Sequence, residues 1–251
     1  MKNQDSWTPS KFVYNNGKLQ GSRDPREVSI SSRLVADNIA EFYQNSLKEH
    51  VKGKLLDLGC GKVPLYAAYK DYSSENICID WGNSLHKNPH LDYEYDLNQK
   101  LVLDDSQFDT IILSDVLEHI RKPELLWSEM SRVMKDDGKI IMSVPFYYWL
   151  HEQPHDYFRY TKFALQSLAE EAGFKVIFLE PYGGAPEILA DVLSKLLRVI
   201  PVIGKPFAMF IQWSTRLFSK TKPGKKLSKR SSDNFPLGYG MIAQKLPVSQ
   251  R

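Results

Sequence analysis

The segment HEQPHDYFRYT, residues 151–161, concentrates side chains that can move a proton or hold a polar ligand. It places His151 and His155 beside the carboxylic acids Glu152 and Asp156. Imidazole titrates near neutral pH and is the usual general base, and a neighbouring carboxylate can orient it. We predict His155 as a base, with His151 as the alternative. The other reading is that these histidines are structural and that one caps the helix that follows.

Other side chains in the same region fit a substrate. Arg159 can pair with an anionic group, and the aromatic rings can stack against a sugar or another ring. The predicted substrate contacts are Tyr147, Asp156, Tyr157, Arg159 and Tyr160. His119, in the motif DVLEHI, is expected to begin a helix, and it is either a third candidate base or a structural histidine.

Short apolar runs alternate with helical patterns around these residues. The expected strands are 54–59, 76–80, 91–96, 108–115, 139–146, 175–180 and 239–245. The expected helices are 31–49, a stretch that opens at Pro64, 123–138 and 162–174. This alternation predicts a doubly wound, mainly parallel α/β sheet, and ligands of such sheets bind beyond the carboxyl ends of the strands. Segment 151–161 follows one of those ends.

The motif LLDLGCGKVP predicts a tight turn between a strand and a helix. Gly59 and Gly61 allow the backbone to turn and to approach a ligand closely. Asp80 ends the next strand, 19 residues after Gly61, where a carboxylate can accept both hydroxyls of a ribose. A dinucleotide fingerprint requires glycine where Pro64 stands, and Asp57 suits a cation better than a phosphate. The pattern favours a nucleoside that carries a positive group over a dinucleotide. Together with Asp96 at a further strand end, it is more specific than a generic turn between a strand and a helix.

The motifs LLDLGCGK, ICID, FDTIILSDVLEHIRKPELLWSEMSRVMKDDGKIIMSVPF and LAEEAGF together resemble those of class I S-adenosylmethionine-dependent methyltransferases over residues 50–180. The resemblance implies a seven-stranded Rossmann-like sheet with S-adenosylmethionine as its cofactor. The predicted cofactor contacts are Asp57, Gly59, Cys60, Gly61, Asp80, Trp81, Asp96, Leu97 and Ser114. One departure is Val63, which stands where the family often has a third glycine, as in a subgroup with a GCGK-x-P turn.

The same resemblance assigns a part of the cofactor to each contact. Asp57 and the turn would face the methionine part, and Asp80 would bind the ribose. Asp96 and Leu97 would flank the adenine. Ser114 would lie against the sulfonium side.

A strand that ends in VPF and continues as HEQPHDYFRYT resembles a subgroup associated with bacterial surface-glycan and lipid-linked sugar pathways. That resemblance implies a hydroxyl of a sugar or lipid-linked glycan as the methyl acceptor. Two alternatives stay open. One is methylation of a small quinone-like or phenolic metabolite, and the other is a cofactor-binding scaffold without catalysis.

The segment between the last two expected strands is apolar and basic. Residues 188–230 hold ten Lys/Arg and one acid, although the whole chain has a net charge of only +3. An apolar helix pair that carries Trp and Phe, followed by a flexible cationic segment, fits an anionic membrane surface. A lid over the substrate or a homodimer face is the alternative, and nucleic acid is disfavoured because the cations do not follow a groove.

The remaining composition is that of a cytoplasmic protein, peripheral at most on the inner face of a membrane. The N-terminal residues lack the apolar stretch of a signal peptide, and Cys60 and Cys78 have no spacing typical of a disulfide framework or a zinc site. No metal is expected. The predicted divisions are an arm and helix (1–50) that could close as a lid, a core (51–187), the insert (188–230) and a last strand (231–251). Residues 1–30 are expected to be irregular.

Overall fold

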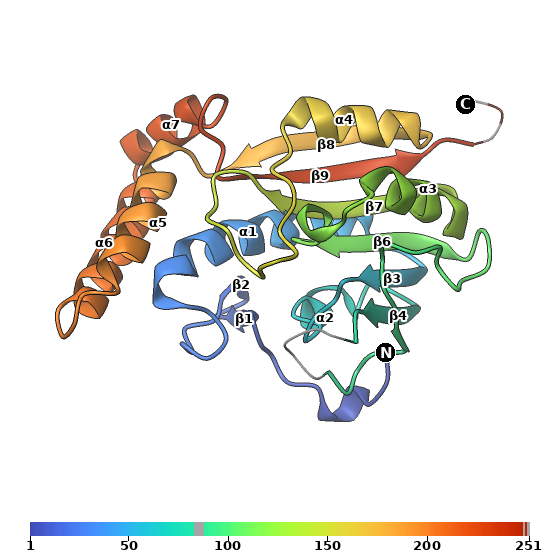
Figure 1. Ribbon diagram of the computed structural model, residues 1–251, viewed down its shortest axis with the longest axis horizontal. Helices are drawn as coiled ribbons and strands as arrows, with labels where there is room; N and C mark the ends of the chain where they lie inside the picture. Colours follow the sequence, from blue (N-terminus) through green and yellow to red (C-terminus); the bar gives the residue numbers. More distant parts are fainter. Residues whose placement is uncertain (83–87, 248, 250–251) are drawn as a thin grey trace.

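A seven-stranded sheet forms the centre of the computed structural model, which describes residues 1–82, 88–247 and 249 (Figure 1). Its strands are β3 (Lys54–Leu58), β4 (Glu75–Asp80), β5 (Tyr93–Glu94), β6 (Phe108–Ser114), β7 (Met134–Pro145), β8 (Phe174–Tyr182) and β9 (Gly238–Lys245). They lie in the order β5-β4-β3-β6-β7-β9-β8. The pairs from β5 to β7 are parallel, and β9 runs antiparallel to both of its neighbours. This topology confirms the predicted fold class.

The strand order changes direction at β3. The chain first moves outward from β3 to β4 and β5, and then returns to add β6 on the other side of β3. Open α/β sheets bind ligands at such a switch point, outside the carboxyl ends of the strands. The site is therefore expected beyond Leu58, Asp80 and Ser114.

Helices cover both faces of the sheet because β6 buries successive side chains on opposite sides. Ile111 and Leu113 belong to one apolar cluster, and Ile112 belongs to the other. The first cluster contains the apolar side of α3 (Pro123–Val133) and of α4 (Lys162–Glu171), and the second contains that of α1 (Arg33–His50) and α2 (Tyr66–Tyr69). The nearly continuous apolar run FDTIILSD is typical of a strand that is buried on both faces.

The N-terminal residues are more ordered than predicted. The expectation of an irregular arm over 1–30 is wrong, because β1 (Phe12–Asn15) and β2 (Lys18–Gly21) form an antiparallel hairpin. Asn16 and Gly17 connect the strands with φ angles of 49° and 73°, as a two-residue hairpin turn requires. Two short 3-10 helices, η1 (Gln4–Ser6) and η2 (Ile30–Ser32), flank the hairpin.

Three helices stand between β8 and β9, at the left of Figure 1. They are α5 (Ala185–Leu197), α6 (Gly204–Lys220) and α7 (Lys222–Ser231). The position of a helical insert was predicted, but its cationic end is helical rather than flexible. The Thr221 side chain accepts a hydrogen bond from the Gly224 backbone N–H at 3.1 Å and caps α7. Among the described residues, no helix is both long and apolar enough to cross a membrane.

Candidate cofactor and acceptor site

The turn after β3 leaves an open approach to its backbone. Gly59 and Gly61 have φ angles of 66° and 50°, and the Gly59 N–H donates to the Ile79 carbonyl at 2.8 Å. A Cβ placed on Gly61 would meet no described atom within 4 Å. Val63 also has a positive φ, 52°, so the turn adopts its shape without the third glycine.

Two carboxylates flank this turn. Asp80 accepts hydrogen bonds from the backbone N–H groups of Gly61 at 2.9 Å and of Trp81 at 2.7 Å. Asp57 is buried, and burial with the nearby charge of Asp80 raises its pKa to about 7, although the Tyr69 hydroxyl donates to it at 3.1 Å. A buried carboxyl that resists ionisation fits a positively charged ligand, because a cation restores the charged form.

The other predicted cofactor residues occupy the same edge in different ways. Asp96 accepts hydrogen bonds from the backbone N–H and side-chain amide of Asn98 at 2.9 and 2.8 Å. Leu97 and Cys60 are buried, and the Ser114 hydroxyl lies 3.4 Å from that of Ser143. The structure thus joins Gly61, Asp80 and Trp81 directly, whereas Asp96 belongs to a separate turn.

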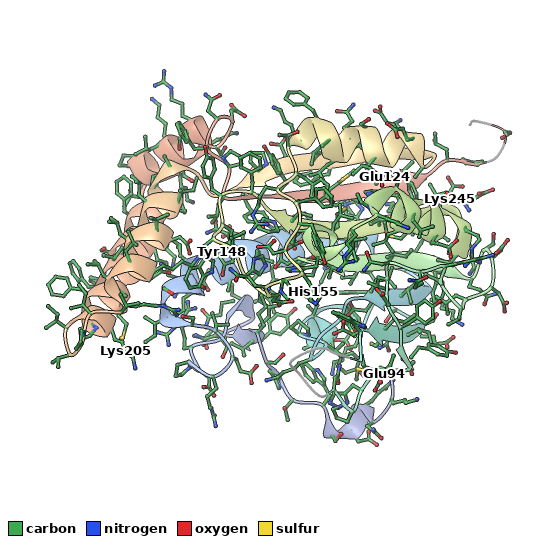
Figure 2. All side chains as sticks on the ribbon, viewed as in Figure 1. Glu94, Glu124, Tyr148, His155, Lys205 and Lys245 are labelled. Carbon is green, nitrogen blue, oxygen red and sulfur yellow. The ribbon has the colours of Figure 1, made fainter. Side chains whose placement is uncertain are left out.

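The acceptor loop, residues 146–161, contains the predicted segment 151–161, runs from β7 to α4 and crosses the same edge (Figure 2). His155 meets the ring of Trp81 edge to face, with centroids 4.9 Å apart. Its Nδ1 lies 3.0 Å from the Tyr157 hydroxyl, which also accepts a hydrogen bond from Arg121 Nε at 2.7 Å. The contact with Trp81 connects the candidate base to the strand that ends in Asp80.

A charged clamp fixes the other end of this loop. Arg159 binds Asp156 through both guanidinium NH2 groups, at 2.6 and 2.7 Å. Burial opposes ionisation of Asp156, but this pairing and the His151 backbone N–H lower its pKa to about 2. Arg159 and Asp156 therefore stabilise the loop itself, and a substrate role for either one stays a prediction.

The aromatic side chains of this loop differ in exposure, and some of them pack inside the protein. Tyr147 and Trp149 are 41% and 46% exposed. Tyr160 is buried and donates to the Leu117 carbonyl at 3.2 Å, and the ring of Tyr148 packs against Lys195 Nζ at 3.6 Å. The exposed rings of Tyr147 and Trp149, and the partly exposed ring of Tyr157, present a face that a substrate could reach.

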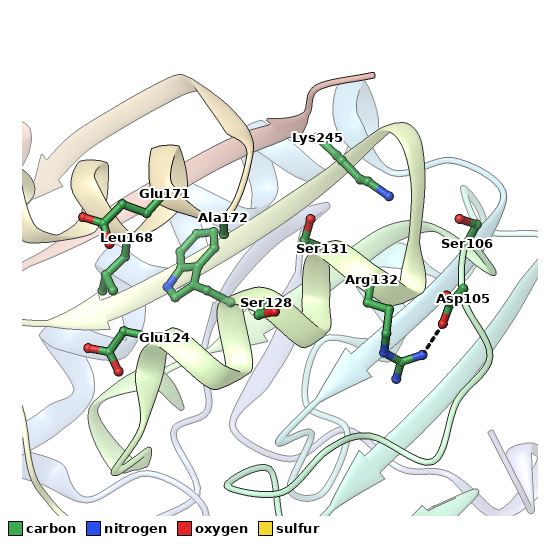
Figure 3. A pocket seen from close by; sticks show the side chains of 11 residues that line it. Asp105, Ser106, Glu124, Ser128, Ser131, Arg132, Leu168, Glu171, Ala172 and Lys245 are labelled. Carbon is green, nitrogen blue, oxygen red and sulfur yellow. Dashed lines mark hydrogen bonds and ion pairs between the residues drawn. The ribbon is translucent and has the colours of Figure 1, made fainter. Parts of the chain in front are cut away.

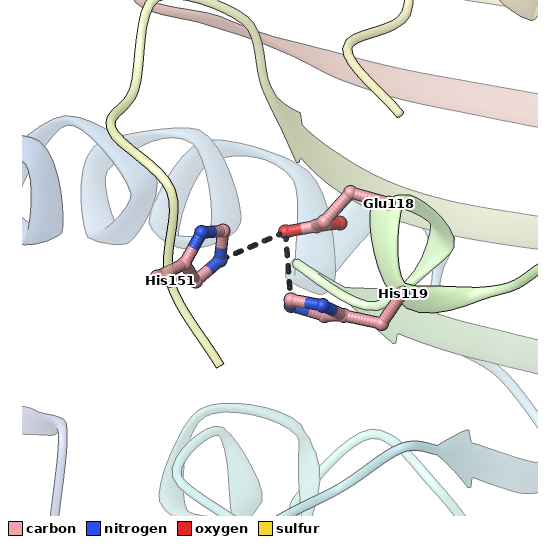
Figure 4. A group of neighbouring side chains, drawn as sticks. All are labelled: Glu118, His119 and His151. Atoms are coloured by element: carbon pink, nitrogen blue, oxygen red, sulfur yellow. Dashed lines mark ion pairs between the residues drawn. The ribbon is translucent and has the colours of Figure 1, made fainter. Parts of the chain in front are cut away.

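The loop also covers a buried acid that the sequence analysis did not single out. Glu118 lies in η3 (Leu117–His119) and is fully buried, with one carboxylate oxygen 3.7 Å from His119 Nε2 and 3.6 Å from His151 Nε2 (Figure 4). His119 ends this short helix, so the prediction that it begins a helix is wrong. The adjacency of an acid and a histidine in DVLEHI was the available signal.

The N-terminal segment reaches this edge from the opposite side. Lys11 Nζ pairs with Asp115 at 2.8 Å, directly after β6, and the Trp7 indole donates to the Val63 carbonyl at 3.1 Å. Burial opposes ionisation of Asp115, yet the charge of Lys11 gives its carboxyl a lowered pKa. Neither Lys11 nor Asp115 was a predicted site residue, because this pairing depends on the hairpin that the sequence analysis missed.

A cavity of about 570 Å³ lies elsewhere, between α3 and α4 (Figure 3). Its lining includes Glu124 and Lys245, which Figure 2 shows away from Tyr148 and His155. Ser106, which precedes β6, also lines it, so the cavity does not open at the carboxyl edge of the sheet. We do not place the cofactor there.

Sequence comparison now adds to this geometry. Residues 28–179, more than half of the chain, match the methyltransferase domain family. The protein is a member of that family. The match confirms the predicted enzyme class, and S-adenosylmethionine is the cofactor that this class implies. No curated protein sequence matches the chain.

Several solved structures share the fold of this methyltransferase. An S-adenosylmethionine-dependent methyltransferase from Mesorhizobium loti is 13% identical, with 84% of this chain and 100% of that one covered at a TM-score of 0.54. One from Archaeoglobus fulgidus is 18% identical, with coverages of 90% and 95% and a TM-score of 0.51. The 4+2 cyclase SpnF is 15% identical, with coverages of 95% and 88% and a TM-score of 0.55. The cyclase illustrates that this fold alone does not define a reaction.

Proposed function

We propose that this methyltransferase transfers a methyl group from S-adenosylmethionine to a hydroxyl of a sugar or lipid-linked glycan. The observation that carries the proposal is the contact between Trp81 and His155, which puts an imidazole beside the candidate cofactor edge. A hydroxyl must lose its proton as it accepts a methyl group, and imidazole is suited to take it.

Residues around the turn after β3 would hold the cofactor. Asp80 would bind the ribose hydroxyls, and Gly59 to Gly61 with Asp57 would contact the methionine part. Asp96 and Leu97 would flank the adenine, and Ser114 would lie near the sulfonium. When bound, S-adenosylmethionine supplies an activated methyl group, and the protein mainly aligns the acceptor with it.

The surroundings of His155 suit a general base. Arg121 Nε donates to the Tyr157 hydroxyl oxygen, which can accept a second hydrogen bond from the protonated Nδ1 of His155. In that tautomer Nε2 carries the lone pair, so it can accept the proton of a substrate hydroxyl. Tyr157 would then be a positioning residue and His155 the catalytic one.

The exposed rings and the insert support a glycan on a lipid. Tyr147 lies beside Phe235, with ring centroids 6.2 Å apart, and sugars stack on exposed rings of this kind. On the insert, Phe210 and Trp213 are 59% and 58% exposed. The helix α7, which packs against α6, carries Lys225, Lys226, Lys229 and Arg230. Helices that combine apolar and basic residues can lie on anionic membranes.

The test is methyl transfer by His155→Gln to a panel of acceptors: monosaccharides, a lipid-linked glycan and a simple phenol. Loss of a general base is expected to lower turnover by about 10²–10⁴-fold with cofactor affinity unchanged. His50→Gln, in a histidine at the end of α1, is the matched control. Normal turnover by His155→Gln would remove the base role. Turnover of the phenol alone would replace the glycan by a phenolic acceptor.

A further inference from the structure

In the cluster of Glu118, His119 and His151, the ring nitrogens of two neutral histidines would face a carboxylate oxygen without a proton between them. His119 Nδ1 lies 2.7 Å from the His155 carbonyl oxygen, which can only accept a hydrogen bond. The proton of neutral His119 is therefore on Nδ1, and Nε2 carries a lone pair. That lone pair is directed at a carboxylate oxygen of Glu118, 3.7 Å away.

His151 repeats this arrangement from the loop above. Its Nδ1 lies 3.2 Å from the Asp156 carboxylate, and its Nε2 lies 3.6 Å from the same oxygen of Glu118. With the proton of neutral His151 on Nδ1, the Nε2 lone pairs of both histidines would face the same carboxylate oxygen, which lies beside both rings in Figure 4. Neither carboxylate oxygen of Glu118 has a hydrogen-bond partner among the described residues, although the side chain is fully buried. A carboxylate buried in this way is stable in its charged form only beside a positive partner.

We propose that Glu118, His119 and His151 bind a first-row divalent cation such as Zn²⁺. Their ligand atoms all lie within 4.8 Å of one another. Two ligands held at about 2.1 Å from a tetrahedral zinc are about 3.4 Å apart, close to the separations of 3.6 and 3.7 Å. Imidazole ligands favour zinc, iron, nickel or copper over magnesium and calcium, which prefer oxygen.

The neighbours of the cluster fit the same proposal. In metal sites, a histidine ligand usually donates its second ring N–H to a carbonyl or a carboxylate, which fixes the orientation of the ring. Here the His155 carbonyl takes that position for His119. The Asp156 carboxylate lies 3.2 Å from His151 Nδ1, although this nitrogen makes no hydrogen bond among the described residues. Glu152 lies 3.9 Å from His119 Nε2 and is 65% exposed, so it could contribute a further oxygen or leave that position to a substrate.

The cation would have a use in the reaction, and this part rests on the proposed function. A cation that binds the acceptor hydroxyl lowers the pKa of that hydroxyl and orients its oxygen. Three protein ligands leave a coordination position open for such a group. The loop that carries His151 also carries His155, so the metal would order the proposed base as well.

The experiment is calorimetric titration of Zn²⁺ into metal-stripped full-length protein, repeated with Mg²⁺ and with Co²⁺ as a spectroscopic probe. We expect one Zn²⁺ per chain, binding of Mg²⁺ at least about 100-fold weaker, and visible absorption of Co²⁺ that Zn²⁺ abolishes. Glu118→Gln and His119→Ala are expected to weaken Zn²⁺ binding by more than about 100-fold, beyond the usual effect of losing an outer neighbour. His155→Gln keeps the backbone carbonyl and is the matched control with unchanged affinity.

Binding as tight in both ligand variants as in the parent protein would overturn the proposal, and so would a parent that binds no Zn²⁺. If the parent protein binds no Zn²⁺, the charge of Glu118 is balanced by a proton on His151 instead. Circular dichroism identifies a variant that does not fold. If Glu118→Gln does not fold, the Zn²⁺ affinity of His119→Ala decides the test, because His119 is partly exposed and its loss disturbs the core less. If Zn²⁺ binds at these residues but no hydroxyl is methylated, the proposed function fails and the metal site stands.

Discussion

The rings of Trp81 and His155 meet edge to face with centroids 4.9 Å apart. Trp81 directly follows β4, and His155 belongs to the loop between β7 and α4, so two distant parts of the chain meet at one edge of the sheet. The contact links the candidate base to Trp81, whose backbone N–H donates to the Asp80 carboxylate. The candidate cofactor residues and the candidate base therefore lie on the same side of the site.

Asp80→Ala is expected to weaken S-adenosylmethionine binding by about 2–3 kcal/mol, which is the loss of charge-assisted hydrogen bonds to the ribose. The substitution also releases the Gly61 N–H, which donates to this carboxylate at 2.9 Å. Calorimetry measures the affinity, and Asp71→Ala, in an exposed acid after α2, is the control. An affinity equal to that of the parent protein would remove Asp80 from the site.

Cofactor affinity is expected to increase as the pH rises from 6 to 8. Burial raises the pKa of Asp57 to about 7, so much of this carboxyl is neutral at pH 6 in the free protein. A bound cation favours the carboxylate, so binding below pH 7 releases a proton and becomes weaker as the pH falls. Calorimetry over this range measures the dependence.

Asp57→Asn removes this titration and should flatten the pH profile of cofactor binding. It retains an oxygen that can accept the hydrogen bond from Tyr69. The same slope in the variant as in the parent protein would assign the pH dependence to another group.

The sheet was predictable because its signals are local. Apolar runs such as FDTIILSD identify a strand buried on both faces, and LLDLGCGK marks the turn after β3. The hairpin was missed although Asn16 and Gly17 are a known hairpin signal, because strands of four residues are too short to show a clear periodicity. β1 and β2 gain their stability by packing Phe12 and Leu19 against α1, which no local pattern reveals.

The residues expected to hold the cofactor are grouped by the strand order, whereas those expected around the acceptor are not. Asp57 and Asp80 end consecutive strands, so the topology alone brings them together. The partners of His151 and Lys11 come from distant segments and depend on how the loop and the hairpin fold over the edge. Glu118 was missed for a related reason, since its burial is a property of the folded chain rather than of the motif DVLEHI.

Charge reversal in α7 is expected to release the protein from anionic vesicles. The helix carries Lys225, Lys226 and Lys229, and each cation near such a surface contributes about 1 kcal/mol to binding. Triple substitution to Glu should abolish co-sedimentation with phosphatidylglycerol vesicles at low salt. Retained binding, or equal binding of the parent protein to neutral vesicles, would contradict the electrostatic role.

Membrane contact through the apolar side of α6 is tested separately by Trp213→Ser. This side chain is 58% exposed, so the substitution should leave the unfolding temperature unchanged while it weakens vesicle binding. Phe163→Ser removes a ring that is 72% exposed from α4, outside the insert, and serves as the control. If both variants bind vesicles as the parent protein does, the exposed apolar side of α6 covers the substrate or a second subunit instead.

Gln212→Ala is expected to detach the insert from the core. The Gln212 side-chain oxygen accepts the Leu34 backbone N–H at 2.8 Å, and its amide donates to the Ser31 carbonyl at 3.1 Å. Leu34 lies in the first turn of α1, where backbone N–H groups lack partners within the helix. Both groups are buried, so the loss of Gln212 leaves a donor and an acceptor unsatisfied.

The expected cost is about 1–3 kcal/mol for each unsatisfied group, measured as the free energy of unfolding in urea. Gln166→Ala is the matched control. Gln166 lies exposed on α4, and its side-chain amide donates a hydrogen bond to Glu170 at 2.8 Å. Faster proteolysis within 185–231 at unchanged sheet stability would mean that the insert opens as a separate unit. Equal stability and equal proteolysis in both variants would show that α6 is held by its apolar contacts alone.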